Sequence, residues 1–546
     1  MNPIMPTDVE YDECDVLVIG SGSAALSAAL RASAWGLRVT ILEKTPLLGG
    51  TSAMSGAGTW IPANHHAASQ GIPDSSAEAL AYIRSASPRG WQEREDDLWA
   101  AFVANAPLML AFLEKHTPLR FKLTEEPDTM VECPGGKRQG RMLSPIPLRK
   151  AILGRYARKV RRSTLPHLYT YQEVYDGDLY HRPVRATLRV AHRLLWRLLT
   201  GSRAQGSALV TGLLKGCLDN GCRIELDSRV IELTVGEDGA IAGAVAESAG
   251  ARRRYRARRG VLIATGGFEW NSELLEKYFP GPIDWRASPR SNEGDGQILA
   301  AGVGAALDRM DQANIYPAMP TRYEGMPHGI PLVFQAEPNA IVVDRHGRRF
   351  VSEYAFNIGE ALDRRDPVSG LPQHLPAWVI ADRRFVKGSP AFLWYARKKT
   401  GWLSKARTLG QLAAQIGLPP GALEATVARY NQFCATGRDD DFHRGETVWE
   451  QFKAGGAGNA LGTIEESPFF AMPLNGSILG TKGGARTNAK GQVLRQDGSV
   501  IAGLYAAGLS MANPIGVRAV GPGTTIGPNL TWGFICGSAL LSDNRL

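Results

Sequence analysis

The sequence lacks the features that mark several classes of protein. Its six cysteines are scattered and form no CxxC or Cys/His spacing, so neither a zinc site nor a disulfide framework is predicted. No apolar run reaches the about 18 residues that a membrane-spanning helix needs. The acidic start MNPIMPTDVEYDECD has no apolar core of a secretory signal. These absences predict a reduced, cytoplasmic chain that holds no metal.

Charge is not concentrated enough to predict a nucleic-acid partner. The formal net charge of +9 comes from 62 Lys and Arg against 53 Asp and Glu, spread over 546 residues. Such a diffuse excess favours anionic ligands only mildly. Hydrophobic content of 44% and charged content of 21% are ordinary for a globular protein. The length predicts two or more domains with a large buried core.

The strongest local signal is a nucleotide-binding pattern at residues 15–44. A short apolar strand, residues 15–20, leads into GSGSAA, an Ala-rich helix follows, and a second strand ends at Glu43. Small residues let a helix N-terminus approach a pyrophosphate, and an acid about twenty residues on binds the ribose hydroxyls. The predicted contacts here are Gly20, Gly22, Ser23, Ala24, Ala25 and Glu43.

A second small-residue loop, LLGGTSAMSGAGTWIPAN at residues 47–64, favours FAD over NAD. An NAD domain usually continues into another helix there, whereas such a loop can follow an extended FAD toward its ring. The chain here resembles the 3-ketosteroid dehydrogenases of the fumarate reductase/succinate dehydrogenase flavoprotein superfamily. The residues that carry the resemblance are Glu43, Lys44, Gly49, Gly50, Thr51, Ser52, Ser55, Gly56, Trp60, Pro62 and Asn64.

The resemblance spans nearly the whole chain and implies further FAD contacts. It places the segment 521–528 of GVRAVGPGTTIGPN against the flavin pyrimidine edge, where backbone N–H groups stabilise the negative charge of the reduced ring. No His stands in the second loop, so the FAD is expected to be non-covalent. The additional predicted contacts are Ala57, Val230, Ala264, Thr265, Gly266, Gly508, Gly523, Thr525 and Ile526.

The fold class expected is α/β, with a Rossmann-like FAD-binding domain of the GR2 type and an inserted α+β cap that covers the substrate. The FAD domain is predicted in two pieces, 1–270 and 465–546, with the cap at 271–464 and a helical excursion at about 75–205. Within the excursion, residues 184–200 carry an arginine every four residues, at 185, 189, 193 and 197. This stripe is either a solvated face paired with acids or a peripheral contact with a membrane.

The catalytic tyrosines that the resemblance implies are replaced in this chain. In the relatives, a tyrosine and a backbone N–H polarise the ketone, a second tyrosine takes the proton beside it, and flavin N5 takes hydride. The matching positions hold Ala519 for the first tyrosine, Gly523 for the backbone donor and Asn357 for the second tyrosine. Before Pro134, where a third tyrosine is expected, the chain has none. An amide cannot serve as a base, so the nearby Tyr354 is a candidate acid/base.

Two other sources could supply the chemistry. Arg518 falls where fumarate reductases place an arginine that clamps a carboxylate, although it could instead pair with a structural acid. The tyrosine-rich stretch at residues 169–181 could also enter the site.

Three functions follow as alternatives. The first is dehydrogenation, or the reverse enone reduction, beside a carbonyl of a cyclic apolar substrate, and Trp60, Phe356 and Trp532 favour it. The second is reduction of a small unsaturated carboxylate through Arg518. The third is an FAD protein without turnover. The sequence does not indicate which external electron carrier the protein uses. No second GxGxxG follows a strand, so direct use of NAD(P)H is not expected.

Overall fold

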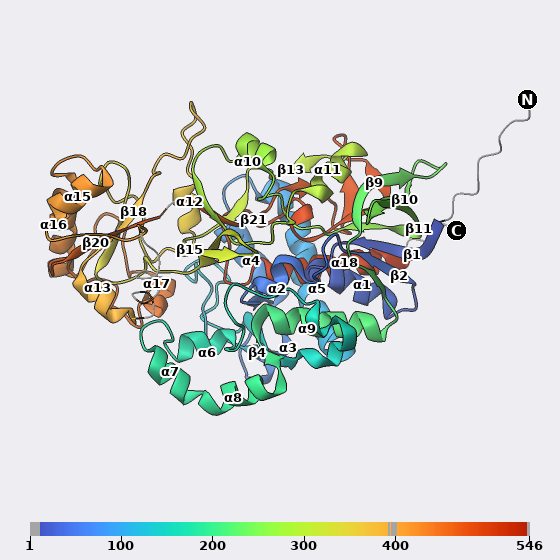
Figure 1. The fold of residues 1–546 in the computed structure, drawn as a ribbon, viewed down its shortest axis with the longest axis horizontal. Helices are drawn as coiled ribbons and strands as arrows, with labels where there is room; N and C mark the ends of the chain where they lie inside the picture. Colours follow the sequence, from blue (N-terminus) through green and yellow to red (C-terminus); the bar gives the residue numbers. More distant parts are fainter. Residues whose placement is uncertain (1–10, 391, 393, 395–400, 475, 543–546) are drawn as a thin grey trace, which may run out of the picture.

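The computed structural model describes residues 11–390, 392, 394, 401–474 and 476–542. Its largest element is an eight-stranded sheet built from both ends of the chain (Figure 1). The strands β8, β2, β1, β11 and β24 are parallel neighbours in that order, β23 pairs antiparallel with β24, and β10 and β9 extend from β11. Their bounds are β1 (Tyr11–Ile19), β2 (Val39–Leu42), β8 (Arg223–Glu225), β9 (Arg229–Val235), β10 (Ile241–Ser248), β11 (Ala251–Ile263), β23 (Gln492–Leu494) and β24 (Val500–Ala506).

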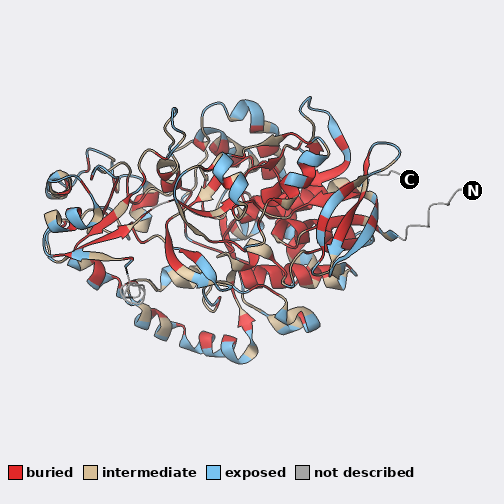
Figure 2. Cartoon of the chain, turned by 45° about the horizontal axis from the view of Figure 1, so that its top comes forward, coloured by how far each residue is buried: buried red, intermediate tan, exposed pale blue. Residues whose placement is uncertain are grey.

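Helices cover the parallel strands, which explains why those strands read as continuous apolar runs. All of α1 (Ser23–Ser33) except Arg31 is buried, and it packs on α9 (Gln205–Asp219) and on the C-terminal α18 (Ile526–Ser542). Two glycines of α18 permit that contact, because a Cβ at Gly533 would lie 2.2 Å from the Ala24 carbonyl oxygen and one at Gly537 2.7 Å from that of Ala28. The sheet and these helices form the most buried part of the molecule (Figure 2).

The cap lies at the other end of the molecule around a four-stranded antiparallel sheet. The sheet has the order β17 (Ala340–Val343), β18 (Trp378–Ala381), β20 (Phe469–Pro473) and β19 (Ser404–Ala406). Strand β20 falls inside the range predicted for the second FAD piece but pairs with cap strands, so the chain re-enters the FAD domain after it. The domain boundaries otherwise stay a prediction. The cap helices are α12 (Ile358–Leu362), α13 (Arg383–Gly388), α15 (Leu409–Ile416), α16 (Ala422–Thr436) and α17 (Val448–Lys453).

Smaller elements connect the two bodies. A three-stranded sheet has the order β12 (Ile283–Arg286), β21 (Gly476–Thr481) and β14 (Ala313–Ile315). A hairpin of β15 (Ala318–Tyr323) and β16 (Met326–Pro331) follows β14 in the chain. The remaining elements near it are α10 (Ser272–Tyr278), α11 (Asp295–Gly302), β13 (Leu307–Asp308) and β22 (Gly484–Ala485).

The helical excursion packs along one side of the FAD domain and reaches the cap. Before it in the chain come α2 (Gly50–Met54), β3 (Thr59–Trp60) and α3 (His65–Ser69). Its early part holds α4 (Ser76–Ala86), α5 (Gln92–His116), β4 (Phe121–Leu123), β5 (Met142–Pro145), β6 (Leu148–Arg149) and a 3-10 segment (Lys150–Arg158). Helix α5 is the one described helix long and apolar enough to cross a membrane, but it packs on α4 and α18 as a core helix does.

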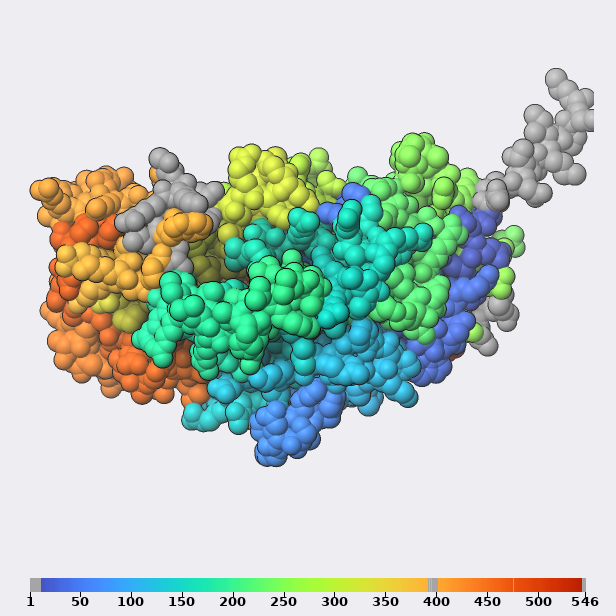
Figure 3. Space-filling model, turned by 60° about the horizontal axis from the view of Figure 1, so that its bottom comes forward, coloured from blue at the N-terminus to red at the C-terminus, as the bar shows by residue number. Residues whose placement is uncertain are grey.

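The arginine-striped segment is not one helix. It divides into α7 (Pro183–Arg189) and α8 (Ala191–Thr200), which follow α6 (Tyr171–Asp176) and precede β7 (Ser202–Arg203). These helices lie on the surface between the cap and the FAD domain, as the green segment in Figure 3 shows. Arg197 is buried and pairs with Glu173, which Arg193 also approaches, so that end of the stripe is paired with an acid, although Arg197 is not solvated.

Candidate functional site

A groove at the carboxyl ends of β1, β2 and β11 has the geometry of a dinucleotide site. Gly20 has φ +108°, and a Cβ there would lie 2.3 Å from the Ala264 carbonyl oxygen, so only glycine fits the turn between strand and helix. The next turn ends at Gly22, the N-cap of α1, which has no side chain to cap the helix, and Ser52 Oγ accepts from the Ser23 N–H at 3.0 Å. The positive end of α1 therefore faces the groove, as a pyrophosphate requires.

Glu43 follows directly after β2 and lines the edge of the same groove. One of its carboxylate oxygens accepts a hydrogen bond of 2.5 Å from Ser21 Oγ, and the other accepts from Thr45 N at 3.0 Å and Thr45 Oγ1 at 2.9 Å. Burial raises the pKa of this carboxyl group, while these donors act against the shift. Fixed donors hold the carboxylate in the orientation that suits ribose hydroxyls. Lys44 is not a free cation, because it pairs with Glu293 at 2.9 Å and Asp295 at 3.0 Å.

Most of the predicted FAD contacts line this groove. They are Gly20, Gly22, Ser23, Ala24, Glu43, Lys44, Gly50, Thr51, Ser52, Val230, Ala264, Thr265, Gly266 and Gly508. Ala25, Gly49, Ser55, Gly56, Ala57 and Ile526 do not line it, and Gly523 and Thr525 line a second cavity instead. Among the lining residues not named as predicted contacts, Ser21 and Asn529 belong to the two glycine-rich motifs, and others come from segments far along the chain: Arg161, Ser228, Ser291, Asn292, Asp295 and Leu509.

The second cavity, of about 190 Å³, lies between the FAD domain and the cap and is lined by uncharged side chains. Its walls come from α6, from β14 and the residues after it, from the stretch before α12, and from residues 517–525. Gly523, at φ +81°, approaches the second glycine loop, since a Cβ there would lie 2.7 Å from Gly58 C and Thr59 N. The Gly523 carbonyl accepts from Trp60 N at 3.3 Å and Gly527 N at 3.0 Å. The bond from Trp60 holds the two loops together.

The two positions at which the resemblance leads us to expect tyrosines are joined to each other. The Asn357 amide donates to the Ala519 carbonyl oxygen at 3.0 Å and accepts from the Ala519 N–H at 2.9 Å. Both residues line the cavity. The Asn357 side chain therefore anchors the segment that carries Gly523, and both of its polar atoms are engaged.

Arg518 and Tyr354 are placed away from the cavity. The Arg518 guanidinium pairs with Glu360 of α12, with Nη2 2.8 Å and Nε 2.9 Å from the carboxylate oxygens. Tyr354 is buried in the cap beside Arg444, whose Cζ lies 5.0 Å from the centroid of its ring, and burial raises the pKa of its hydroxyl. Neither residue lines the cavity, so the structure does not bring them to the predicted catalytic position.

Two tyrosines do line the cavity. Tyr171, from the tyrosine-rich stretch, begins α6, and its hydroxyl donates to the buried Glu126 over 3.3 Å. Tyr316, which the sequence did not indicate, follows β14. Burial raises the pKa of both hydroxyls. Of the three aromatic residues expected near the substrate, Phe356 lines the cavity, whereas Trp60 and Trp532 are core residues.

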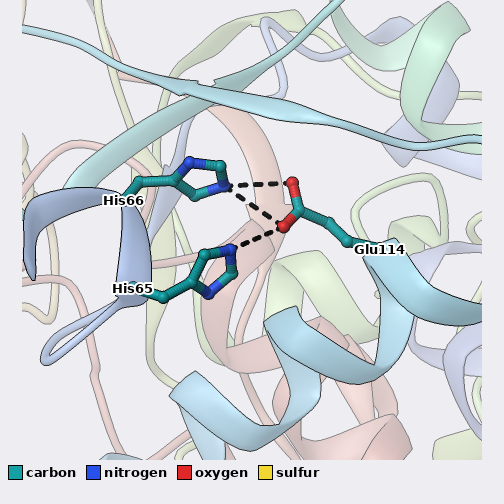
Figure 4. A group of neighbouring side chains, drawn as sticks. All are labelled: His65, His66 and Glu114. Carbon is teal, nitrogen blue, oxygen red and sulfur yellow. Dashed lines mark hydrogen bonds and ion pairs between the residues drawn. The ribbon is translucent and has the colours of Figure 1, made fainter. Parts of the chain in front are cut away.

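One group of side chains elsewhere has the composition of a metal site. His65 and His66 of α3 face Glu114 of α5, and their three ligand atoms lie within 4.8 Å of one another (Figure 4). The carboxylate accepts from His65 at 2.7 Å, from His66 at 3.0 Å and from the Phe121 N–H at 2.9 Å. These bonds already satisfy the carboxylate and tie α3 to α5. The three side chains line neither the groove nor the cavity.

A dinucleotide groove, a glycine-lined loop leading from it and an uncharged cavity at the loop's end define a flavin-dependent oxidoreductase. The FAD binding domain family matches residues 15–526, and the chain belongs to this family. FAD is its cofactor. The residues present fit FAD, because the α1 N-terminus can bind the pyrophosphate and Glu43 can accept hydrogen bonds from the ribose. The 521–528 loop can contact the flavin ring.

Similar proteins act beside carbonyl groups of rings. The chain is 36% identical to a 4-oxocyclohexanecarboxylate 2-dehydrogenase of Sinomonas cyclohexanicum, covering 96% of this chain and 92% of that protein. It is 34% identical to a 3-oxosteroid 1-dehydrogenase of Mycobacterium tuberculosis, covering 96% and 97%. A structure of 3-ketosteroid delta1-dehydrogenase from Sterolibacterium denitrificans with 1,4-androstadiene-3,17-dione superposes with a TM-score of 0.86 at 29% identity, covering 97% and 99%. The resemblance and fold class drawn from the sequence are confirmed, and the chain is an FAD-dependent oxidoreductase acting next to a carbonyl.

Proposed function

We propose that this protein dehydrogenates a neutral, largely apolar cyclic ketone across the bond between the carbon beside its carbonyl and the next ring carbon. The observation that carries the proposal is the chemistry of the 190 Å³ cavity. No Arg, Lys, His, Asp or Glu of the described residues lines it. A carboxylate entering such a cavity would lose its hydration without gaining a cation, which costs more than transfer of a neutral ketone. This argues against the alternative of a small unsaturated acid held by Arg518.

We assign the backbone N–H of Gly523 as the hydrogen-bond donor to the substrate's carbonyl oxygen. This N–H forms no hydrogen bond with any part of the chain that the structure describes, and it stands at the cavity wall. A backbone donor aimed at a ketone oxygen stabilises the negative charge that develops there when a neighbouring proton leaves. FAD, when bound, supplies the two-electron acceptor for the hydride.

The test is a comparison of matched ketones. The FAD-loaded protein is mixed anaerobically with a saturated 3-ketosteroid, with 4-methylcyclohexanone and with 4-oxocyclohexanecarboxylate, and the oxidised flavin absorbance is followed. We expect bleaching by the neutral ketones at rates at least tenfold above that of the carboxylate. Bleaching by the carboxylate alone would overturn the neutral-substrate assignment. A flavin that no ketone bleaches, but that fumarate reoxidises after chemical reduction, would establish the fumarate-reductase alternative.

We further propose that α7 and α8 contact an anionic membrane surface, which would suit delivery of an apolar substrate. Leu188 of α7 is 70% exposed and Leu199 of α8 is 78% exposed, and Arg185 and Arg189 of α7 and Arg193 of α8 are exposed as well. Apolar and cationic side chains together are what an interfacial helix needs at an anionic bilayer. The apolar side chains exposed on this segment are Val184, Leu188, Leu195, Trp196, Leu198 and Leu199.

Vesicle sedimentation tests this contact. We expect more protein to sediment with vesicles containing phosphatidylglycerol than with pure phosphatidylcholine vesicles. The double variant Leu188→Glu/Leu199→Glu should lose roughly tenfold in the bound-to-free ratio. Val368→Glu is the control, because Val368 is 93% exposed in a cap turn far along the chain from these helices. Equal binding of the double variant and the control to the anionic vesicles would refute the contact.

A further inference from the structure

The side chain at the cavity with the most distinctive surroundings is Tyr171. Its position is well defined, because Thr170 and Glu173 form a capping box that starts α6 at this residue. Its ring lies on the second glycine loop, since a Cβ at Gly56 would be 3.1 Å from Tyr171 Cδ2 and one at Gly58 3.7 Å from Cε2. That same loop touches Gly523. The phenol and the proposed carbonyl donor therefore border one small volume.

Behind Tyr171 lies a carboxylate with spare accepting capacity. Glu126 is 4% exposed, and one of its oxygens accepts from the Tyr171 hydroxyl at 3.3 Å. The other oxygen is buried and has no hydrogen-bond partner among the described residues. Burial raises the pKa of this carboxyl group, and the positive charge of Lys453 opposes the shift. A buried carboxylate with an unsatisfied oxygen costs stability, and such costly groups cluster at functional sites.

We propose that Tyr171 takes the proton beside the substrate carbonyl and passes its own proton to Glu126, so that the pair replaces the tyrosine that Asn357 displaced. This assignment rests on the proposed function. The C–H bond beside the carbonyl breaks, and its proton forms a new O–H bond at Tyr171 Oη. The proton already on Tyr171 moves to the Glu126 carboxylate. The electron pair stays on the substrate as an enolate, whose oxygen faces the Gly523 N–H. The oxidant for the remaining hydride is FAD.

The other tyrosines nearby lack this arrangement. Tyr316 lines the cavity, and burial, helped by the charge of Glu126, raises the pKa of its hydroxyl, but among the described residues no hydrogen bond joins that hydroxyl to a carboxylate. Tyr175 lies against Tyr171, with 3.3 Å between their hydroxyl oxygens, and it does not line the cavity. Lys453 lies 4.2 Å from the Tyr175 ring centroid and completes the charged groups near the pair. Among the described residues that line the cavity, Tyr171 is the tyrosine whose hydroxyl is hydrogen-bonded to a carboxylate.

Proton exchange tests the assignment without net turnover. The flavin is first reduced anaerobically, so that no dehydrogenation occurs, and a saturated cyclic ketone that bleaches the oxidised enzyme is added in D₂O. We expect the enzyme to exchange the protons beside the carbonyl, as measured by NMR. Tyr171→Phe should slow the exchange by about 100-fold or more. Its Kd for the ketone, read from the perturbed flavin spectrum, should stay within threefold of the original.

The control variants distinguish a proton-transfer role from a packing role. Tyr175→Phe removes a neighbouring hydroxyl and should exchange within twofold of the unmodified enzyme. Glu126→Gln should slow the exchange while Tyr171 stays in place, and it serves if Tyr171→Phe does not fold. Rapid exchange by Tyr171→Phe, loss of exchange in Tyr316→Phe alone, or an enzyme that bleaches without exchanging any such proton would each overturn the assignment. A flavin that no ketone bleaches would instead reject the proposed function itself.

Discussion

Arg518, the one charged residue of the glycine-rich stretch 516–529, is bound by Glu360 of the cap. Its Nη2 lies 2.8 Å from one carboxylate oxygen and its Nε 2.9 Å from the other. Arg518 stands between Val517 and Ala519, which both line the cavity, yet its charge is directed to α12. The ion pair thus joins the C-terminal segment to the cap and leaves the cavity without a cation from this stretch.

Removing the acid should release the arginine toward the cavity. We expect Glu360→Gln to strengthen binding of 4-oxocyclohexanecarboxylate by about three- to tenfold, because a partly exposed cation gained at short range is worth roughly 1 kcal/mol. Binding of 4-methylcyclohexanone should not change. The measurement is the Kd of each ketone from the flavin spectrum. In the double variant Glu360→Gln/Arg518→Met the gain should disappear, and a gain that persists there would show that Arg518 is not its source.

The Asn357 amide should contribute to stability through its two bonds to Ala519. Asn357→Ala removes a donor and an acceptor and leaves the Ala519 backbone groups unpaired, at a cost of about 1–3 kcal/mol in the free energy of unfolding. Asn357→Asp is the matched comparison, because a carboxylate still accepts from the Ala519 N–H but no longer donates to its carbonyl. Urea unfolding of the FAD-loaded variants measures both. If the alanine variant matched the unmodified protein, the amide would not anchor this segment.

Much of the nucleotide site could be predicted from sequence because its parts are local. Gly20, Gly22 and Glu43 belong to one strand–turn–helix–strand unit, whose spacing is set by the fold of about thirty residues. Ser21 and Asn529 belong to the two glycine-rich motifs, but nothing in those motifs indicates that these two side chains reach the groove. Asn292 and Asp295 reach the groove only through tertiary packing of a distant loop, which no local pattern reports.

The substrate cavity was less predictable for the same physical reason. Gly523 and Asn357 were found through the resemblance, and the tyrosine-rich stretch was recognised without indicating which ring enters. No local pattern predicts that Tyr316 and Glu126 lie at the site, because residues from α6, β14 and the cap, which are distant in the chain, form their surroundings. Arg518 and Tyr354 were reasonable choices by residue type. Their partners, Glu360 and Arg444, lie far away in the chain, so no sequence pattern indicates that these pairs form.

Lys482 should make stability depend on pH above neutrality. Its ammonium group is fully buried and donates to the carbonyl oxygens of Ile515 at 3.0 Å and Gly516 at 2.6 Å, and burial lowers its pKa from 10.5 to about 7. Between those values the unfolded chain binds more protons at this site than the folded chain. The free energy of unfolding therefore rises with pH across that window, by up to about 1.4 kcal/mol per pH unit from this group.

Lys482→Met should remove that part of the slope in urea unfolding between pH 7.5 and 9.5. Lys490→Met, at an exposed position, controls for the loss of one lysine, and parallel profiles for Lys482→Met and the unmodified protein would contradict the prediction.

The close approach at Gly523 should make it far less replaceable than an ordinary left-handed glycine. Gly498 has φ +83° and open space around its missing Cβ, so Gly498→Ala isolates the cost of the backbone conformation, about 1–2 kcal/mol. Gly523→Ala pays the same conformational cost at φ +81°, and its Cβ would also meet Gly58 and Thr59 at 2.7 Å. Relief of that contact must separate the two loops, which adds roughly 1–3 kcal/mol. We therefore expect a larger loss of unfolding free energy in Gly523→Ala, together with weaker ketone binding that Gly498→Ala does not show. Equal losses in the two variants, with ketone binding intact, would mean that the two loops can separate without consequence for the cavity.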